Sequence, residues 1–162
     1  SIHNQAFDLY KEKNWEKLEK LFSENNINGK WPLANGGYNV EKVYLKAGQK
    51  FDRYQYKIAV DDKGKLDFSG GYISPMNEGG QAFDYGSRAL KGSENEYEIY
   101  YEITVKKDFD FLVEQGDIIP WWGHVGNGKQ IALPEDKGIK WLLEKEYIEI
   151  KPIKSPKGNI KL

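Results

Sequence analysis

The sequence predicts an α+β fold in which N-terminal helices precede a mainly antiparallel, twisted β core. The first 22 residues have apolar side chains at helical spacing, and after Gly37 the pattern changes to short β-prone runs. Aromatic residues reach 14%, including 11 Tyr and 5 Trp, a richness typical of β-rich folds. A chain of 162 residues has room for one core. We therefore expect a single domain, 1–162, with an N-terminal helical segment (1–29), a β-rich core (30–154) and a tail (155–162).

The N-terminal segment carries the clearest helical pattern. Between Asn4 and Phe22, apolar residues recur three or four positions apart among charged ones: Phe7, Leu9, Tyr10, Trp15, Leu18, Leu21 and Phe22. This spacing predicts one or two amphipathic helices, with a break near Asn14. The Asn-rich segment 24–30 then ends them, because Asn and Gly favour turns.

The rest of the chain reads as strands separated by Gly and Asp. Residues 97–105, YEIYYEITV, alternate in the period of a half-buried strand, so one face should be core and the other should meet water or a cleft. Residues 60–67 predict a hairpin turn, and residues 139–146, after Gly138, predict a short helix that leads into a last strand, 147–153.

Composition excludes several classes of protein. There is no cysteine, hence no disulfide or thiolate chemistry, and a net charge of -1 gives no field for nucleic acid. No apolar run approaches the roughly 20 residues that span a bilayer. His3 and His124, far apart in the chain, do not predict a metal site.

The segment IIPWWGHVGNGKQI, residues 118–131, is the most informative part of the chain. It places aromatic surface beside a glycine-rich backbone that can approach a ligand closely, a combination that predicts a small-molecule cleft. Residues 123–130 fit the phosphate-loop spacing GxxxxGK, but Gln130 stands where Ser or Thr must bind magnesium. We therefore interpret the loop as one that aims Gln130 into a pocket.

Several segments in order resemble one family. KWPLANGGY (30–38), LKAGQKFDRYQ (45–55), GGYISP (70–75) with SRAL (87–90), and PWWGHVGNGKQ (120–130) follow one another as in the TNT domain family of NAD-glycohydrolase toxins. The resemblance runs from about Trp31 to about Ile150. It implies an ADP-ribosyltransferase-like fold.

The resemblance also implies roles for individual residues. Gln130 lies where the family has its catalytic glutamine, and Arg53 and Arg88 match family binding arginines, with Arg53 assigned beside Gln130 to catalysis. A guanidinium suits a diphosphate because it binds phosphate oxygens in bidentate fashion. The family also has a functional histidine before the strand that ends in YYEITV, whereas this chain has Glu98, Ile99 or Tyr100 there.

Aromatic and glycine residues complete the predicted site. Tyr72 and Trp122 are candidates to stack on nicotinamide or adenine, and Gly126 and Gly128 to let the backbone approach the substrate. For Trp122 the sequence favours packing in the core and stacking on a ligand equally. Trp121 is expected in the core, and Trp31 as a structural plug.

By this resemblance we expect an NAD(P)⁺ glycohydrolase that needs no cofactor, since NAD is its substrate. The family implies a toxin used in interbacterial competition, secreted or delivered within a larger protein, active in the target-cell cytoplasm and restrained by an immunity protein. Two alternatives stay open. Glu96 and Glu98 form the ExE spacing of mono-ADP-ribosyltransferases, and the aromatic residues also fit a non-catalytic ligand-binding module.

Overall fold

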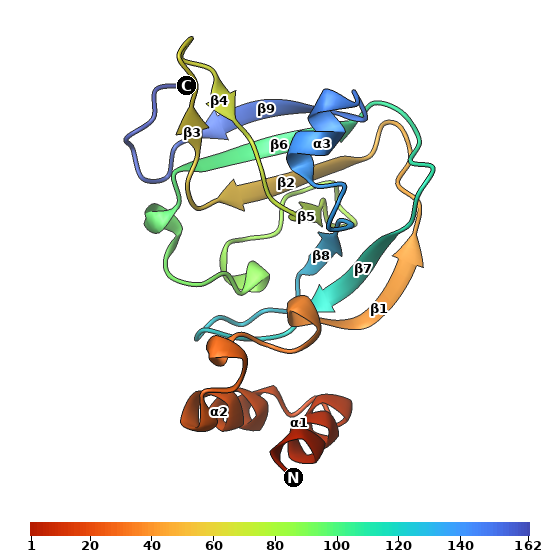
Figure 1. Ribbon diagram of the computed structural model, residues 1–162, viewed down its shortest axis with the longest axis vertical. Coiled ribbons are helices and arrows are strands. Elements are labelled where there is room, and N and C mark those ends of the chain that lie inside the picture. Colours follow the sequence, from red (N-terminus) through yellow and green to blue (C-terminus); the bar gives the residue numbers. More distant parts are fainter.

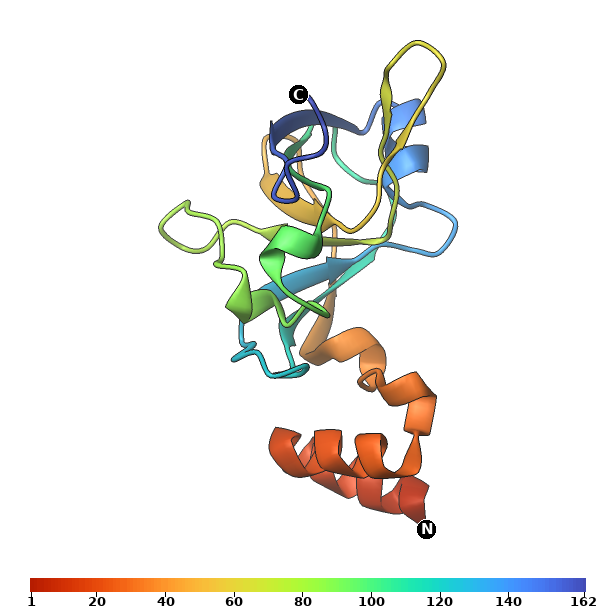
Figure 2. The same cartoon turned by 90° about the vertical axis from the view of Figure 1, so that its left-hand side faces the viewer.

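The computed structural model describes all 162 residues. Two helices at the N-terminus form a lobe below a sheet that makes up most of the molecule (Figures 1 and 2). We call residues 1–36, which hold α1, α2 and two short 3₁₀ turns, the N-terminal lobe. No helix combines the length and the apolar character that a membrane crossing needs.

The lobe follows the predicted helical pattern. Helix α1 spans Ile2–Lys11 and α2 spans Trp15–Asn25, and the side chain of Asn14 caps α2 by accepting from the Lys17 N–H. Left-handed Asn26 ends α2. The 3₁₀ turns η1 (Ile27–Lys30) and η2 (Ala34–Gly36) then lead into the sheet. The predicted break at Asn14 is confirmed.

Seven strands form the sheet, in the order β1-β7-β8-β5-β2-β6-β9, and every neighbouring pair is antiparallel. The strands are β1 (Gly37–Val43), β2 (Lys50–Gln55), β5 (Tyr72–Pro75), β6 (Ile99–Val105), β7 (Val113–Ile118), β8 (Lys129–Ala132) and β9 (Ile148–Lys154). Figure 1 shows β7 and β1 turned steeply from β2, β6 and β9, so the sheet is strongly twisted. The predicted α+β class with an antiparallel, twisted sheet is confirmed.

The remaining elements are short. A hairpin of β3 (Ala59–Val60) and β4 (Leu66–Asp67) stands apart from the sheet, and helix α3 (Ile139–Glu144) precedes β9. Both were predicted. Two 3₁₀ turns, η3 (Gly86–Arg88) and η4 (Glu94–Glu96), lie in the long connection from β5 to β6.

The molecule has separate hydrophobic clusters. The largest contains 15 buried residues, among them Ile99, Ile131 and Leu142, and lies between the sheet and α3. A second, of five residues, joins the lobe to the 118–131 segment: Ala6, Leu18, Phe22, Ile119 and Trp121. These two clusters support the two sides of the site described below, and a third, smaller cluster contains Tyr54, Tyr97 and Tyr100.

One feature of the predicted strand 97–105 was wrong. Strand β6 begins at Ile99, and Tyr100, expected on the wet or cleft-facing side, is buried. Its hydroxyl donates to the buried Asp52 carboxylate at 2.6 Å, and its neighbours Ile99 and Tyr101 are buried as well, so both faces of this end of the strand are covered.

Candidate functional site

A cleft of about 380 Å³ lies between the N-terminal lobe and the sheet. Residues from four parts of the chain line it: Trp31 and Asn35 from the lobe, Arg53 and Tyr72 from β2 and β5, Arg88 and Lys91 from the β5–β6 connection, and Trp122 and Gln130 from the 118–131 segment. The predicted site residues Arg53, Tyr72, Arg88, Trp122 and Gln130 therefore come together in space.

Gln130 sits on β8, opposite Gly116 of β7. Its amide nitrogen donates to the Asn35 carbonyl at 2.9 Å, which fixes the carboxamide against the start of the sheet. A Cβ atom at Gly37 would lie 3.2 Å from that nitrogen, so glycine there leaves room for the amide. The amide oxygen has no hydrogen-bond partner within the protein and remains an acceptor for a hydroxyl or a water.

Arg53 lies where the ladder between β2 and β5 ends. These strands pair only at Phe51–Pro75 and Asp52–Ser74. Beyond that point Arg53 Nε donates to the Ser69 carbonyl at 3.1 Å and Nη1 to the Tyr72 carbonyl at 3.0 Å. The side chain thus satisfies main-chain oxygens that the ladder leaves unpaired, and its position is fixed by them.

Arg88 is held differently, in a buried ion pair. Its Nη1 and Nη2 donate to the two Asp52 carboxylate oxygens at 2.5 and 2.8 Å, and the side chains are 3% and 0% exposed. Its guanidinium also lies 4.9 Å from the centre of the Tyr54 ring. Burial alone lowers the pKa of Arg88, but the Asp52 carboxylate more than offsets this and raises it above its ordinary value.

Aromatic rings form the lobe side of the cleft. Trp31 and Trp122 pack edge to face with centroids 5.1 Å apart, and the main-chain N–H of Trp122 donates to the Glu19 carboxylate of α2 at 2.8 Å. Trp31 is 48% exposed, so the prediction that it is a structural plug was wrong. Trp31 lies outside the five-residue cluster of the lobe and lines the cleft.

Trp121 contributes to the cleft lining but is buried. It is 1% exposed, donates from its indole nitrogen to the Lys30 carbonyl at 2.9 Å, and packs edge to face on Phe22. The prediction that it is core is confirmed. Tyr72, 44% exposed, stands at the opposite edge of the cleft.

Lys91 is a cleft residue that the sequence reasoning missed. Its ammonium lies 4.9 Å from the Trp122 ring centre and 5.3 Å from that of Trp31. It makes no ion pair. A lysine three positions after the singled-out Arg88 was a signal, but only the fold brings it over the two tryptophans.

Gly126 and Gly128 do not line the cleft. A Cβ atom on Gly126, whose φ is +61°, would lie 2.6 Å from the Pro120 nitrogen, and one on Gly128 would lie 2.8 Å from the Ser87 carbonyl. Both positions are glycine because the loop packs tightly on neighbouring backbone. The structure thus gives these glycines a packing role in place of the predicted approach to a ligand.

The residues proposed for other chemistry are engaged elsewhere. Glu96 accepts from the Ser93 N–H in a capping box on η4, and Glu98 accepts from the Ile58 N–H at 2.9 Å. His124 bonds to the Gly92 carbonyl. None of these lines the cleft, nor does Tyr100, and no group of three or more histidine, aspartate or glutamate side chains could hold a metal ion.

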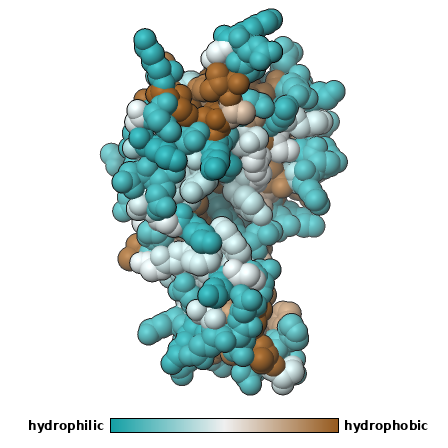
Figure 3. Space-filling view, turned by 60° about the vertical axis from the view of Figure 1, so that its left-hand side comes forward, coloured by the Kyte–Doolittle hydropathy of each residue, from teal (hydrophilic) through white to brown (hydrophobic).

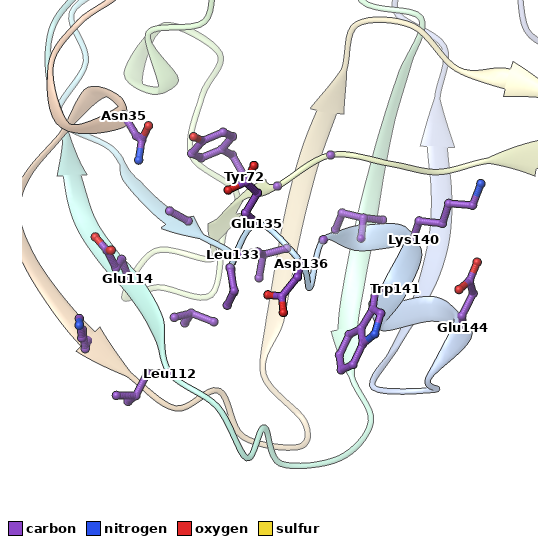
Figure 4. A pocket seen from close by; sticks show the side chains of 18 residues that line it. Asn35, Tyr72, Leu112, Glu114, Leu133, Glu135, Asp136, Lys140, Trp141 and Glu144 are labelled. Atoms are coloured by element: carbon purple, nitrogen blue, oxygen red, sulfur yellow. The ribbon is translucent and has the colours of Figure 1, made fainter.

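Electrostatics distinguish the cleft from a larger hollow on the same molecule. The lining of the cleft includes three cationic residues and no carboxylate. The hollow, about 1050 Å³, runs from Tyr72 to α3 and carries Glu114, Glu135, Asp136 and Glu144 with two lysines (Figure 4). An anionic ligand is favoured in the cleft and disfavoured in the hollow.

The face of the molecule seen in Figure 3 is largely hydrophilic, with hydrophobic residues gathered mainly towards the two ends. Within the cleft, the two shifted pKa values, those of Arg88 and Tyr97, are both raised. Burial is the main cause for Tyr97. Neither group is moved towards neutral pH, so the cleft offers fixed charges and hydrogen-bonding groups.

Comparison with known proteins places the chain in a family. The family model described as TNT, tuberculosis necrotizing toxin, matches residues 44–150, about two-thirds of the chain. The chain belongs to this family. The match includes Arg53, Tyr72, Arg88, Trp122 and Gln130 but begins after Trp31, where the sequence resemblance was taken to start.

Solved structures similar to this TNT family member include the tuberculosis necrotizing toxin complexed with its immunity factor IFT. The TM-score is 0.52 at 18% identity, over 74% of this chain and 60% of the toxin chain. Two others, each with a TM-score of 0.44, are Rhs1-CT in complex with cognate immunity protein RhsI1 (15% identity, 76% and 86% covered) and Tse6 in complex with Tsi6 (14%, 89% and 97%). No curated protein sequence matches the chain. The chain spans about three-fifths of the length of the tuberculosis necrotizing toxin chain, and at 18% identity this similarity shows a shared fold.

Proposed function

We propose that the domain hydrolyses NAD⁺, with NADP⁺ as a second candidate substrate, to nicotinamide and ADP-ribose. The observation that carries the proposal is Gln130: its amide nitrogen is fixed by Asn35 while its amide oxygen stays free, in a cationic and aromatic cleft. The family match, which includes Gln130 and the other cleft residues except those of the lobe, such as Trp31 and Asn35, supports it.

The chemistry suits such a cleft. Nicotinamide leaves from an already cationic form, so the N-glycosidic bond breaks without a strong acid, and the enzyme must stabilise an oxocarbenium-like ribose and admit water. Gln130 neither donates nor takes up a proton at neutral pH. Its free amide oxygen orients a ribose hydroxyl or the attacking water.

The other residues hold the substrate. Arg53 supplies a guanidinium in a fixed position beside Gln130, while Trp31, Trp122 and Tyr72 offer flat rings at the two edges of the cleft. NAD⁺ is the substrate in this scheme and no further cofactor is required.

The family match also supports a proposal for the biological role. We propose a toxin domain, carried by a larger secreted or delivered protein, that depletes NAD in the cytoplasm of the target cell during competition between bacteria. A cognate immunity protein would cover the cleft. The complex of the tuberculosis necrotizing toxin with its immunity factor supports this partner.

The test is nicotinamide release from NAD⁺ by the purified domain. Gln130→Ala should lower kcat about 10²- to 10³-fold with a smaller change in substrate affinity, because the lost contact acts mainly in the transition state. Gln115→Ala, on the adjacent strand β7 and outside the cleft, is the matched control. Equal activity of the two variants would contradict the role of Gln130.

A non-catalytic binding module is the second candidate, because exposed Trp31 and Tyr72 and partly buried Trp122 line one cleft. It predicts NAD⁺ binding without nicotinamide release. The mono-ADP-ribosyltransferase alternative has weaker support, since Glu96 and Glu98 are bound to main-chain groups outside the cleft. Transfer of labelled ADP-ribose to protein would favour it.

A further inference from the structure

The three cations of the cleft are not equivalent. Arg88 uses four of its five N–H groups within the protein: two on the Asp52 carboxylate, and Nε and Nη2 on the Phe83 carbonyl at 3.1 and 2.8 Å. The Asp52 carboxylate balances its charge. To bind a phosphate in bidentate fashion, Arg88 would have to abandon a buried, charge-assisted pair.

Arg53 keeps its charge and part of its fork available. Nε and Nη1 each donate once, to main-chain carbonyls, while Nη2 has no partner and no carboxylate lies within ion-pair distance. The guanidinium packs closely against Gly70, where a Cβ atom would collide with Nη2. Its orientation is thus fixed without its charge being balanced.

Lys91 is the second cation with an unbalanced charge. Its ammonium lies over Trp122 and Trp31 and makes no ion pair, although its own carbonyl accepts from the Tyr97 hydroxyl at 3.0 Å. The rings hold the ammonium beside the surface on which a flat base would stack, and leave its N–H donors free. No Asp or Glu lines the cleft to compete for it.

We propose that Lys91 joins Arg53 in binding the diphosphate of the dinucleotide, and that Arg88 has a structural role, holding the cleft floor through Asp52 without contacting the ligand. The proposal rests on the proposed function for the identity of the ligand. Two unbalanced positive charges match the two negative charges of the diphosphate. Lys91 is then a substrate-binding residue. Arg88, which was expected to contact the substrate, contacts Asp52 instead.

The test is calorimetric binding of ADP-ribose and of inorganic pyrophosphate, neither of which requires turnover. Lys91→Met and Arg53→Met should each weaken both ligands about tenfold or more, because each removes a charge-assisted contact. The matched control is Lys107→Met, since Lys107 also lies over a ring, that of Tyr147 at 4.3 Å, but outside the cleft. Its affinities should equal those of the unaltered domain.

The structural role of Arg88 makes a separate prediction. Arg88→Lys should lower thermal stability, because it loses the bidentate pair, yet keep the ADP-ribose affinity of the folded protein within about threefold. If that variant does not fold, the double variant Asp52→Leu with Arg88→Met, which removes the whole pair, provides the same reading.

Unchanged affinity in Lys91→Met would overturn the proposal, as would a tenfold loss in an Arg88 variant that folds. An unaltered domain that binds neither ligand would also overturn it. If the domain releases nicotinamide but Lys91→Met has no effect, this inference is rejected and the proposed hydrolase function is retained. If pyrophosphate binding depends on Lys91 but NAD⁺ is not cleaved, this inference is retained and the hydrolase function is rejected.

Discussion

The wall of the cleft that the sheet provides and the wall that the N-terminal lobe provides rest on different cores. Arg53, Tyr72 and Gln130 come from strands supported by the 15-residue cluster, and two of them are fixed by hydrogen bonds to carbonyls. Trp122 packs against the five-residue cluster around Trp121, and Trp31 packs edge to face on Trp122. The groups proposed for polar chemistry thus have the larger support, and the flat rings the smaller.

This difference separates two kinds of function. A polar group must stay within a few tenths of an ångström of its working position, whereas a stacking ring tolerates more movement. The family match follows the same division in part, because it contains all of the sheet wall from residue 44 but omits Trp31 and Asn35 of the lobe. Damage to one wall should therefore be separable from damage to the other.

The largest expected effect comes from breaking the lobe wall at Trp121. Trp121→Ala should lower the free energy of unfolding by about 4 kcal/mol, because it removes a fully buried ring and its hydrogen bond to Lys30. Urea unfolding measures this, and Phe7→Ala, at a site 60% exposed on α1, should change it by less than about 0.5 kcal/mol.

The same experiment tests whether the two cores are separate. In Trp121→Ala, three of the four remaining tryptophans, Trp15, Trp31 and Trp122, report on the lobe side, whereas far-UV circular dichroism reports the sheet as well. We expect the fluorescence transition to move to lower urea than the dichroism transition. Coincident transitions would mean that the two walls unfold as one unit.

The sheet wall has its own weak point in the pair of Asp52 and Arg88. Asp52→Asn should lower the free energy of unfolding by about 3 kcal/mol, because it leaves a buried guanidinium without its counter-charge. Glu102→Gln, directly opposite on β6 and partly exposed, is the control and should be nearly neutral. A small effect of Asp52→Asn would show that Arg88 finds another anion.

A smaller change moves one cation without touching the core. Gly70→Ala places a Cβ atom against the Arg53 guanidinium at a residue with φ of +112°, which should cost about 2 kcal/mol of stability. ADP-ribose affinity should fall with it, because Arg53 is displaced. Gly71→Ala, where a Cβ atom meets nothing within 4 Å, should alter neither quantity, and an equal loss there would refute the explanation.

Much of the fold was readable from the sequence because local patterns set it. The helical spacing before Asn14, the hairpin at 60–67 and the helix after Gly138 all depend on near neighbours, and all three are confirmed. The predicted solvent exposure of Tyr100 was wrong because its burial depends on Arg88 and Asp52, which are far away in the chain. Alternation within one strand does not contain that information.

The site was partly readable for the same reason. The residues singled out by type and by family position, such as Gln130 and Arg53, do line one cleft. What the sequence did not contain was which charges are already balanced: Arg88 is paired with Asp52, whereas Lys91 is not paired at all. Trp31 and the loop glycines were misjudged because their surroundings come from the fold and not from adjacent residues.

The smallest expected effect is a pH dependence of stability that comes from Glu94, which links β9 to Tyr54 of β2. Glu94 accepts from Lys154 of β9 at 2.9 Å and from the Tyr54 hydroxyl at 3.0 Å. The Lys154 ammonium, followed by the Tyr54 hydroxyl, lowers the pKa of Glu94 below its ordinary value although partial burial opposes this. The folded state thus favours the ionised carboxylate.

The direction of the pH effect follows from that shift. A carboxyl with a lowered folded pKa contributes its stability above the unfolded pKa, about 4.3, and loses it as the pH falls through the folded pKa. Glu94→Gln should therefore be less stable than the unaltered domain at pH 7, by less than about 1 kcal/mol because the pair is partly exposed, and the difference should shrink towards pH 3. Urea unfolding at the two pH values measures it. A stability difference that is the same at both pH values would mean that Glu94 acts through hydrogen bonds alone and not through its charge. A difference that grows in acid would contradict a stabilising ion pair between Glu94 and Lys154.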